Sequence, residues 1–429
     1  MYEPILIALN FFLLFFIIKK NKSNYYIISP ALIYYFIWTL ALSFYYLKII
    51  PFGDIDKSTF FLISSASIIY FLGYLLSIIF IKVKRVNKNK INNNIYLEIE
   101  AYKKIIGFGG IISTAISFFG LIMFLSKIGA IFALDFAVKY LNVVDDIILN
   151  TRIGIAGYLI YFVVPAFIFN YISFLALNRN KFILLLIVNL ITVAANTRRS
   201  LFFFSLILLF ILNYYLIKNL KSFKKEIKYK SIIITILMAL MVLIYFSFIQ
   251  ISLYKSFVNI QKDNSLKYAL YDMIAYLSGN IAVIPYYIEM NYNSGVFLGY
   301  TFYSIYAILN NIFPESIKMP YFMNEFVNVP IKLNTVPYFI YWYFDLGYLY
   351  MFIMILFVGF ISEWSYKKFI HSPNFFNAIV LSYLCIFSFL SIRENIFMNS
   401  IFFWFSLFLI LLFWKIKNNL WVYKRMFAI

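Results

Sequence analysis

Long apolar runs alternate with short polar connections along most of the chain. The runs hold roughly 17–24 residues, which is enough for a helix to cross the ~30 Å hydrocarbon core of a bilayer. A helix satisfies its backbone hydrogen bonds internally, so the pattern predicts an all-α, polytopic membrane helical bundle. Eleven transmembrane helices are expected, over residues 2–18, 28–47, 59–81, 105–125, 153–176, 182–196, 201–217, 231–253, 338–361, 375–391 and 396–414.

One long connection, residues 254–336, separates the eighth and ninth expected spans and is rich in aromatic residues. Within it, Ser265–Tyr276 and Gly299–Ile312 have the pattern of amphipathic helices, and three prolines break the rest of the connection into turns. We therefore expect a large external loop that lies on the bilayer surface or folds over the outer mouth of the bundle. The chain is accordingly expected to divide into residues 1–253, 254–336 and 337–429.

Composition and charge agree with a membrane protein and give its orientation. The chain is 64% hydrophobic and only 13% charged, which excludes a soluble enzyme. The connections on one side of the expected bundle carry 24 of the 37 Lys and Arg residues but only 4 of the 17 acids. The other side carries 13 of each, so the net charge of +20 is an orientation signal. The positive-inside rule then predicts a periplasmic N-terminus and a cytoplasmic C-terminus. Anionic membrane lipids rather than nucleic acid are the expected partners of the basic face.

Several kinds of chemistry lack the residues they need. The single cysteine, Cys385, lies in an apolar span and cannot form a disulfide within the chain. The single histidine, His371, lies in a connection expected on the cytoplasmic side, so it cannot serve an external site. No glycine-rich phosphate loop or zinc spacing is present, which argues against an ATPase or a metalloprotease. Asp54-Ile55-Asp56 resembles a metal clamp, but two acids in a short turn are common, and we expect no metal or cofactor.

Arginines at the expected external membrane boundary are the strongest candidates for a binding site. Four of the seven arginines lie there, namely Arg152, Arg198, Arg199 and Arg393. Positive charge on external turns works against the orientation rule, and a guanidinium offers a planar fork that binds phosphate in a bidentate way. These residues therefore predict a phosphate or pyrophosphate clamp at the outer face. The alternative is that they only anchor helix ends at the interface.

Two acids close to these arginines are candidates for a general base. Glu394 follows Arg393 directly, and Asp345 lies near the outer start of the ninth expected span. An ionisable group at membrane depth is costly and is usually functional. A structural alternative remains for Asp345, which could pair with a cation of the loop.

Four stretches together resemble the bacterial oligosaccharide repeat-unit polymerases, the Wzy-type O-antigen polymerase family. Asn196–Leu201 is similar to the family's short arginine-containing turn between two central spans, with Arg198 in the Arg position, although a second arginine follows it here. The other three are Phe297–Pro314 in the loop, Tyr341–Gly347 at the start of the ninth span, and Ser391–Glu394 before the last span. The likeness covers about the last 240 residues.

The resemblance implies a GT-C-like membrane glycosyltransferase at the periplasmic face of the bacterial inner membrane. Its substrate would be undecaprenyl-pyrophosphate-linked oligosaccharide, polymerised into O-antigen or another surface polysaccharide. The four external arginines would bind the pyrophosphate, Glu394 or Asp345 would be the general base, and a Wzz-type chain-length regulator would be a candidate partner. An O-antigen ligase would usually place a histidine in the large loop, and a flippase should show two similar halves. These two classes, and a membrane protein without an active site, are the alternatives.

Overall fold

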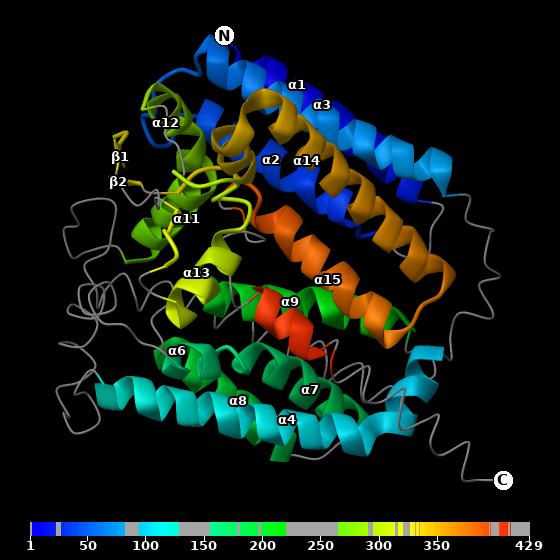
Figure 1. The fold of residues 1–429 in the computed structure, drawn as a ribbon. Helices are drawn as coiled ribbons and strands as arrows, with labels where there is room; N and C mark the ends of the chain where they lie inside the picture. The colour runs from blue at the N-terminus through cyan, green and yellow to red at the C-terminus, as the bar shows by residue number, and fades with distance from the viewer. Residues whose placement is uncertain are drawn as a thin grey trace. The chain divides into compact units, whose positions relative to one another are not determined.

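The computed structural model describes residues 2–22, 27–81, 94–127, 155–177, 181–195, 199–219, 265–290, 295–313, 316–320, 327–330, 332–333, 335–393, 395, 403–410 and 412. Nearly all of them are helical (Figure 1). Among them, four helices are long and apolar enough to cross a membrane: Lys57–Phe80, Lys103–Ser126, Tyr158–Leu175 and Tyr338–His371. The expected helical class is therefore confirmed for this part of the chain, and the long apolar helices indicate a membrane protein. The eleven spans stay a prediction.

The contacts between elements divide the chain into two compact units. Unit 1 comprises Met1–Val86, Ser256–Ser372 and Leu381–Ile401, and unit 2 comprises Asn87–Lys255, Pro373–Val380 and Phe402–Ile429. The elements of unit 1 are α1 (Glu3–Asn21), α2 (Pro30–Tyr46), α3 (Lys57–Phe80), α11 (Ser265–Ala282), α12 (Ile284–Glu289), α13 (Tyr303–Ile312), the antiparallel strands β1 (Val327–Asn328) and β2 (Lys332–Leu333), and α14 (Tyr338–His371). Unit 2 contains α4 (Asn94–Lys127), α6 (Ile155–Ile160), α7 (Val163–Leu177), α8 (Lys181–Ala195) and α9 (Arg199–Asn219). The first part of α15 (Phe375–Leu390) belongs to unit 2 and the second part to unit 1.

The expected boundary at residue 254 lies outside the described residues, and residue 337 is the N-cap of α14.

The helices α2 and α3 begin where short polar side chains cap them. The Ser29 hydroxyl accepts from the amide of Leu32 at 3.2 Å, and Pro30 supplies the fixed backbone angle that suits a first helical turn. Asp56 caps α3 by accepting from the amides of Ser58 and Thr59, both at 3.2 Å. These caps fix the residue at which each helix begins, so the loop between α2 and α3 ends at a defined point.

A sharp break divides α14 into two helices. Leu346 and Gly347 have non-helical backbone angles, and the φ of +76° at Gly347 lies in the left-handed region that favours glycine. We call residues 338–345 the short helix and residues 348–371 the long helix. The predicted span over 338–361 therefore contains a change of direction that hydropathy alone does not indicate.

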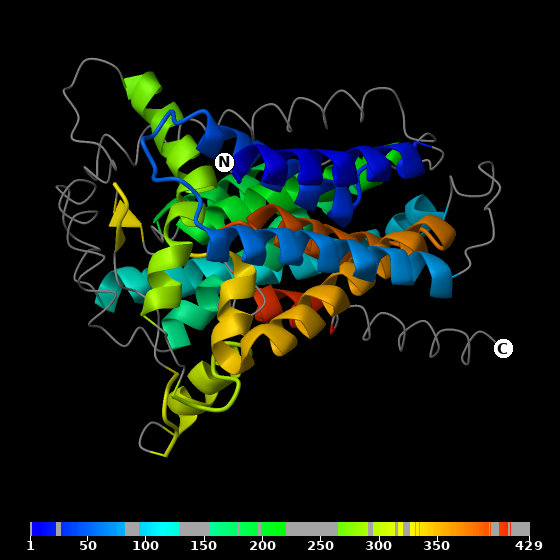
Figure 2. The same ribbon diagram turned by 90° about the horizontal axis from the view of Figure 1, so that it is seen from above.

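The long helix packs closely along α3, and Figures 1 and 2 show the two helices side by side. Gly73 and Gly359 make this possible, because a Cβ atom at either position would collide with backbone of the other helix: Leu356 for Gly73 and Tyr70 for Gly359. Small residues that let two backbones approach are typical of helix contacts in membranes. Within unit 1, α1 and α12 also contact α3, and α2 contacts α14.

Unit 2 has its own polar contact between apolar helices. Asn170 of α7 donates to the hydroxyl of Thr114 at 2.8 Å and to the carbonyl of Gly110 at 3.4 Å, both in α4. A hydrogen bond between apolar helices fixes their register at modest energetic gain. The adjacent Tyr171 of α7 donates to the side chain of Asn213 in α9. These contacts hold α4, α7 and α9 together.

Candidate functional site

The chain makes an irregular turn inside unit 1 after α15 ends. The indole of Trp38 donates to the hydroxyl of Ser391 at 3.1 Å, and Trp38 lies about midway along α2. The amide of Tyr338 donates to the carbonyl of Ser391 at 3.0 Å, and the side chain of Asn395 donates to the carbonyl of Tyr338 at 3.2 Å. The end of α15 and the start of the short helix thus meet midway along α2. We call this place the internal junction, formed by Tyr338, residues 391–393 and Asn395.

Aromatic side chains surround the internal junction. Tyr34, Trp38, Tyr338 and Trp342 are all fully buried. The hydroxyls of Tyr34 and Tyr338 lie 3.3 Å apart, and the ring of Tyr338 meets those of Trp342 and Phe387 edge-on at 5.2 and 5.3 Å. The indole nitrogen of Trp342 has no hydrogen-bond partner among the described residues, although buried polar atoms are usually paired. The junction is therefore an aromatic enclosure with polar groups inside it.

Arg393 is part of this junction and is half-buried. Its amide donates to the carbonyl of Leu390 at 2.9 Å, which closes the turn that carries the side chain. Irregular backbone at membrane depth is tolerated only where protein covers it or where it lines a cavity. A guanidinium binds anionic groups through a planar fork of donors.

Asp345 lies at the other end of the short helix, about 10 Å along its axis from Tyr338. One carboxylate oxygen accepts from the amide of Tyr300 at 2.9 Å. The other accepts from the amide and the hydroxyl of Thr301 at 2.7 and 2.6 Å, and the Thr301 hydroxyl in turn accepts from Tyr350 at 2.8 Å. Asp345 therefore fastens the segment before α13 to the bend in α14.

The remaining predicted site residues have no described side chains. Arg152, Arg198 and Glu394 lie outside the described residues. Arg199 is the first residue of α9, in unit 2, and only its backbone is described. Of the residues predicted for the clamp and the base, only Arg393 and Asp345 have described side chains. Arg393 lies in the internal junction at the start of the short helix, and Asp345 is the last residue of that helix. Whether the other residues join Arg393 stays a prediction.

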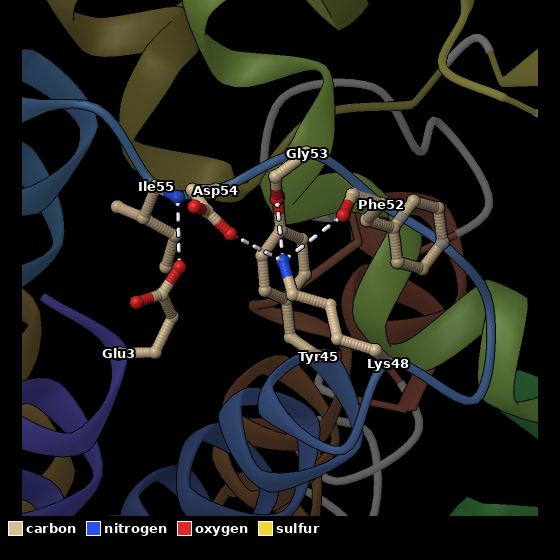
Figure 3. Close-up of polar contacts among 7 residues, drawn as sticks. All are labelled: Glu3, Tyr45, Lys48, Phe52, Gly53, Asp54 and Ile55. Atoms are coloured by element: carbon tan, nitrogen blue, oxygen red, sulfur yellow. Dashed lines mark hydrogen bonds and ion pairs between the residues drawn. The ribbon is translucent and has the colours of Figure 1, made fainter. Parts of the chain in front are cut away.

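A second feature, which the sequence did not indicate, is a pocket beside the loop between α2 and α3. Lys48 adopts a left-handed backbone angle (φ 51°), and its ammonium donates to the carbonyls of Phe52 and Gly53 and to the carboxylate of Asp54, all at 2.9–3.0 Å (Figure 3). The Tyr45 hydroxyl also donates to the Gly53 carbonyl, at 2.7 Å. These bonds hold residues 51–55 in a fixed curve.

The same loop is tied to α1 and lines the pocket. The carboxylate of Glu3 accepts from the amide of Ile55 at 2.9 Å (Figure 3). The pocket has a volume of about 270 Å³ and is lined by this loop, by Tyr45 and Thr59, by the junction of α11 and α12, and by residues 329–330. Because its walls come from segments that are far apart in the chain, no local motif could have revealed it.

The two acids of Asp54-Ile55-Asp56 serve separate purposes. Asp54 pairs with Lys48, whereas Asp56 caps α3. Burial raises the pKa of Asp56, but the hydrogen bonds from Ser58 and Thr59 outweigh it and hold the pKa below its usual value. Among the described residues, no cluster of three or more His, Cys, Asp or Glu side chains is placed to hold a metal ion.

Comparison with known proteins found no relative of this chain. No protein-family model, no curated protein and no solved structure matches this chain. Its function is therefore inferred from the residues and their geometry.

Proposed function

We propose that this protein is a membrane glycosyltransferase that polymerises undecaprenyl-pyrophosphate-linked oligosaccharide repeat units at the periplasmic face of the bacterial inner membrane. In this proposal the bundle has eleven spans, a GT-C-like architecture and a large periplasmic loop. The observation that carries it is the position of Arg393, which stands on an irregular turn inside a helical unit, midway along α2.

The reaction transfers the growing glycan from its lipid carrier to a new repeat unit. A hydroxyl of the acceptor sugar attacks the anomeric carbon of the donor, the bond from that carbon to the pyrophosphate oxygen breaks, and the hydroxyl proton passes to a base. Undecaprenyl pyrophosphate leaves with the negative charge. A guanidinium fixed in a low-dielectric enclosure stabilises this charge as it develops, which is where an oriented donor contributes most.

The proposed roles come from the chemistry. Arg393 binds the pyrophosphate, together with Arg198, Arg199 and Arg152, and Glu394 or Asp345 takes the proton. If Asp345 were the base, it would have to exchange a hydrogen bond from Thr301 for one from the acceptor hydroxyl. Glu394 adjoins Arg393 in the sequence.

The test replaces Arg393 with lysine in cells whose native gene is deleted. Deletion should leave single repeat units on the cell surface, and R393K should restore only short chains, because a lysine keeps the charge but loses the bidentate fork. Loss of one oriented donor of this kind typically lowers turnover by about 10²–10³-fold. The readout is the length distribution of the surface glycan, normalised to the amount of protein in the membrane.

A matched control is Arg179→Lys, which makes the same change in a connection expected on the cytoplasmic side. It should support chains of normal length. Normal chains with R393K would overturn the role of Arg393. Complete loss of exported glycan after deletion, rather than single units, would indicate a flippase instead.

A further inference from the structure

Glu363 lies inside the contact between α3 and the long helix. It follows Gly359 by one helical turn, and a Cβ atom at Gly359 would collide with the backbone of α3. One turn further along, the ammonium of Lys367 donates to the carbonyls of Ser77 and Ile81 in and at the end of α3, at 3.1 and 3.2 Å. Glu363 therefore faces α3 between these two contacts, and only 3% of it is exposed.

The carboxyl group of Glu363 has no direct partner in the part of the chain that the structure describes. Its Oε2 atom accepts no hydrogen bond there. Lys367 on the same helix and Lys20 on α1 attract it through their charges, but neither forms an ion pair with it, and Tyr70 and Tyr74 of α3 also act on it. An ionised carboxylate in this position would be a buried charge without a direct partner, which is strongly unfavourable. The neutral acid is therefore the form that fits the structure.

Lys367 has a different role in this structure. Ile81 ends α3, and carbonyls at a helix C-terminus lack partners within the helix. The ammonium of Lys367 supplies a donor to the Ile81 carbonyl, and its positive charge suits the negative end of the helix dipole. Lys367 also lies four residues after Glu363, the spacing at which a Glu followed by a Lys forms a favourable ion pair on a helix. One ammonium thus has two alternative acceptors, the end of α3 and the Glu363 carboxylate.

We propose that Glu363 is a proton-binding site and that Lys367 changes its partner when Glu363 ionises. With the proton bound, Lys367 holds the end of α3 as in the structure. When the carboxyl group releases its proton to water, the carboxylate draws Lys367 away from Ser77 and Ile81, and the end of α3 loses its cap. All these residues belong to unit 1, and the switch does not depend on the proposed glycosyltransferase activity.

Infrared spectroscopy of the full chain in lipid membranes tests the proton-binding site. At about pH 7 exposed carboxyl groups are ionised, so the C=O stretching band of a protonated carboxyl reports a buried one. The wild type should show such a band that Glu363→Gln lacks, and the band should disappear as the pH is raised to about 10. Lys367→Met removes a cation that stabilises the carboxylate, so the band should persist to a higher pH. A wild-type spectrum without this band, or a band that Lys367→Met leaves unmoved, would overturn the proposal.

Hydrogen exchange at the end of α3 tests the change of partner. Wild type and E363Q are compared at equal pH, so that the intrinsic pH dependence of exchange cancels. Above the pH at which the infrared band is lost, the amides of residues 77–81 should exchange about two- to fivefold faster in the wild type, and below it equally fast. Loss of the band without faster exchange would refute the change of partner.

The matched control is Glu289→Gln, the same substitution at an exposed residue of α12. It should follow the wild type in both measurements. If Glu289→Gln also removed the band or slowed the exchange at the end of α3, the assignment to Glu363 would be wrong.

Discussion

The carboxylate of Asp345 accepts three hydrogen bonds from two adjacent residues, Tyr300 and Thr301. Its position near the outer start of a span makes it a candidate base, and the sequence could not show that a loop residue 44 positions away would donate to it twice. Arg393 is a candidate from its residue type and its place in the sequence, and its role stays a prediction. The sequence indicated a position at the outer boundary of a span, whereas the turn that carries Arg393 lies midway along α2. Residue type is a local signal, but hydrogen bonds and depth depend on distant parts of the chain.

The Thr301 hydroxyl can be tested separately from the carboxylate. Thr301→Val removes the bond to Asp345 and leaves Tyr350 without the acceptor it uses. We expect the free energy of unfolding to fall by about 1–2 kcal/mol and the segment before α13 to be cleaved faster by protease. Thermal unfolding and limited proteolysis in detergent measure these effects. Thr39→Val, which removes a bond only within α2, should change neither by a comparable amount, and equal effects would contradict the role of Asp345 as a fastening.

Element boundaries agreed closely with hydropathy where a helix runs without interruption. The predicted span over 59–81 corresponds to α3, and the span over 105–125 falls within the apolar part of α4. Hydropathy did not predict the break at Leu346 and Gly347 within the span over 338–361, because it carries no information on the direction of the backbone. The glycine was the only local signal of that break.

The contact between α3 and the long helix gives a prediction at this scale. In Gly73→Ala, the added methyl group meets backbone of Leu356 and Phe360, which cannot rotate away. We expect a loss of about 1–3 kcal/mol in stability, as for other overpacked contacts. The temperature at which the purified protein unfolds measures it. Gly53→Ala is the control, since nothing lies within 4 Å of a Cβ atom there and its unfolding temperature should stay unchanged. If neither variant changed the unfolding temperature, the close contact between α3 and the long helix would not contribute to stability.

The orientation of the whole molecule can be tested with introduced thiols. The native Cys385 is buried and should not react, so an added cysteine would report alone. Ser316 and Ser372 are both exposed, the first in the expected periplasmic loop and the second at the C-terminal end of the long helix. Ser316→Cys should react with a membrane-impermeant maleimide in cells with a permeabilised outer membrane, and Ser372→Cys only after the inner membrane is opened. The reverse pattern would overturn the orientation drawn from the charges.

Several large apolar side chains in and beside α13 are exposed. Phe297, Phe302, Ile305, Ile308 and Phe313 are all exposed, and Figure 2 shows α13 extending beyond the bend of α14. Such a helix is suited to lie in the bilayer surface, which is one of the two positions expected for this loop and stays a prediction. Because Asp345 bonds the segment before α13 to α14, a displacement of α13 would be transmitted to the bend of α14.

The length of α15 bears on where the chain can turn. Its 16 residues span about 24 Å, several ångströms less than the hydrocarbon core of an average bilayer. Its side chains are buried or half-buried throughout, so protein rather than lipid surrounds it. The turn that carries Arg393 therefore follows a protein-covered helix that is too short to cross the core by itself.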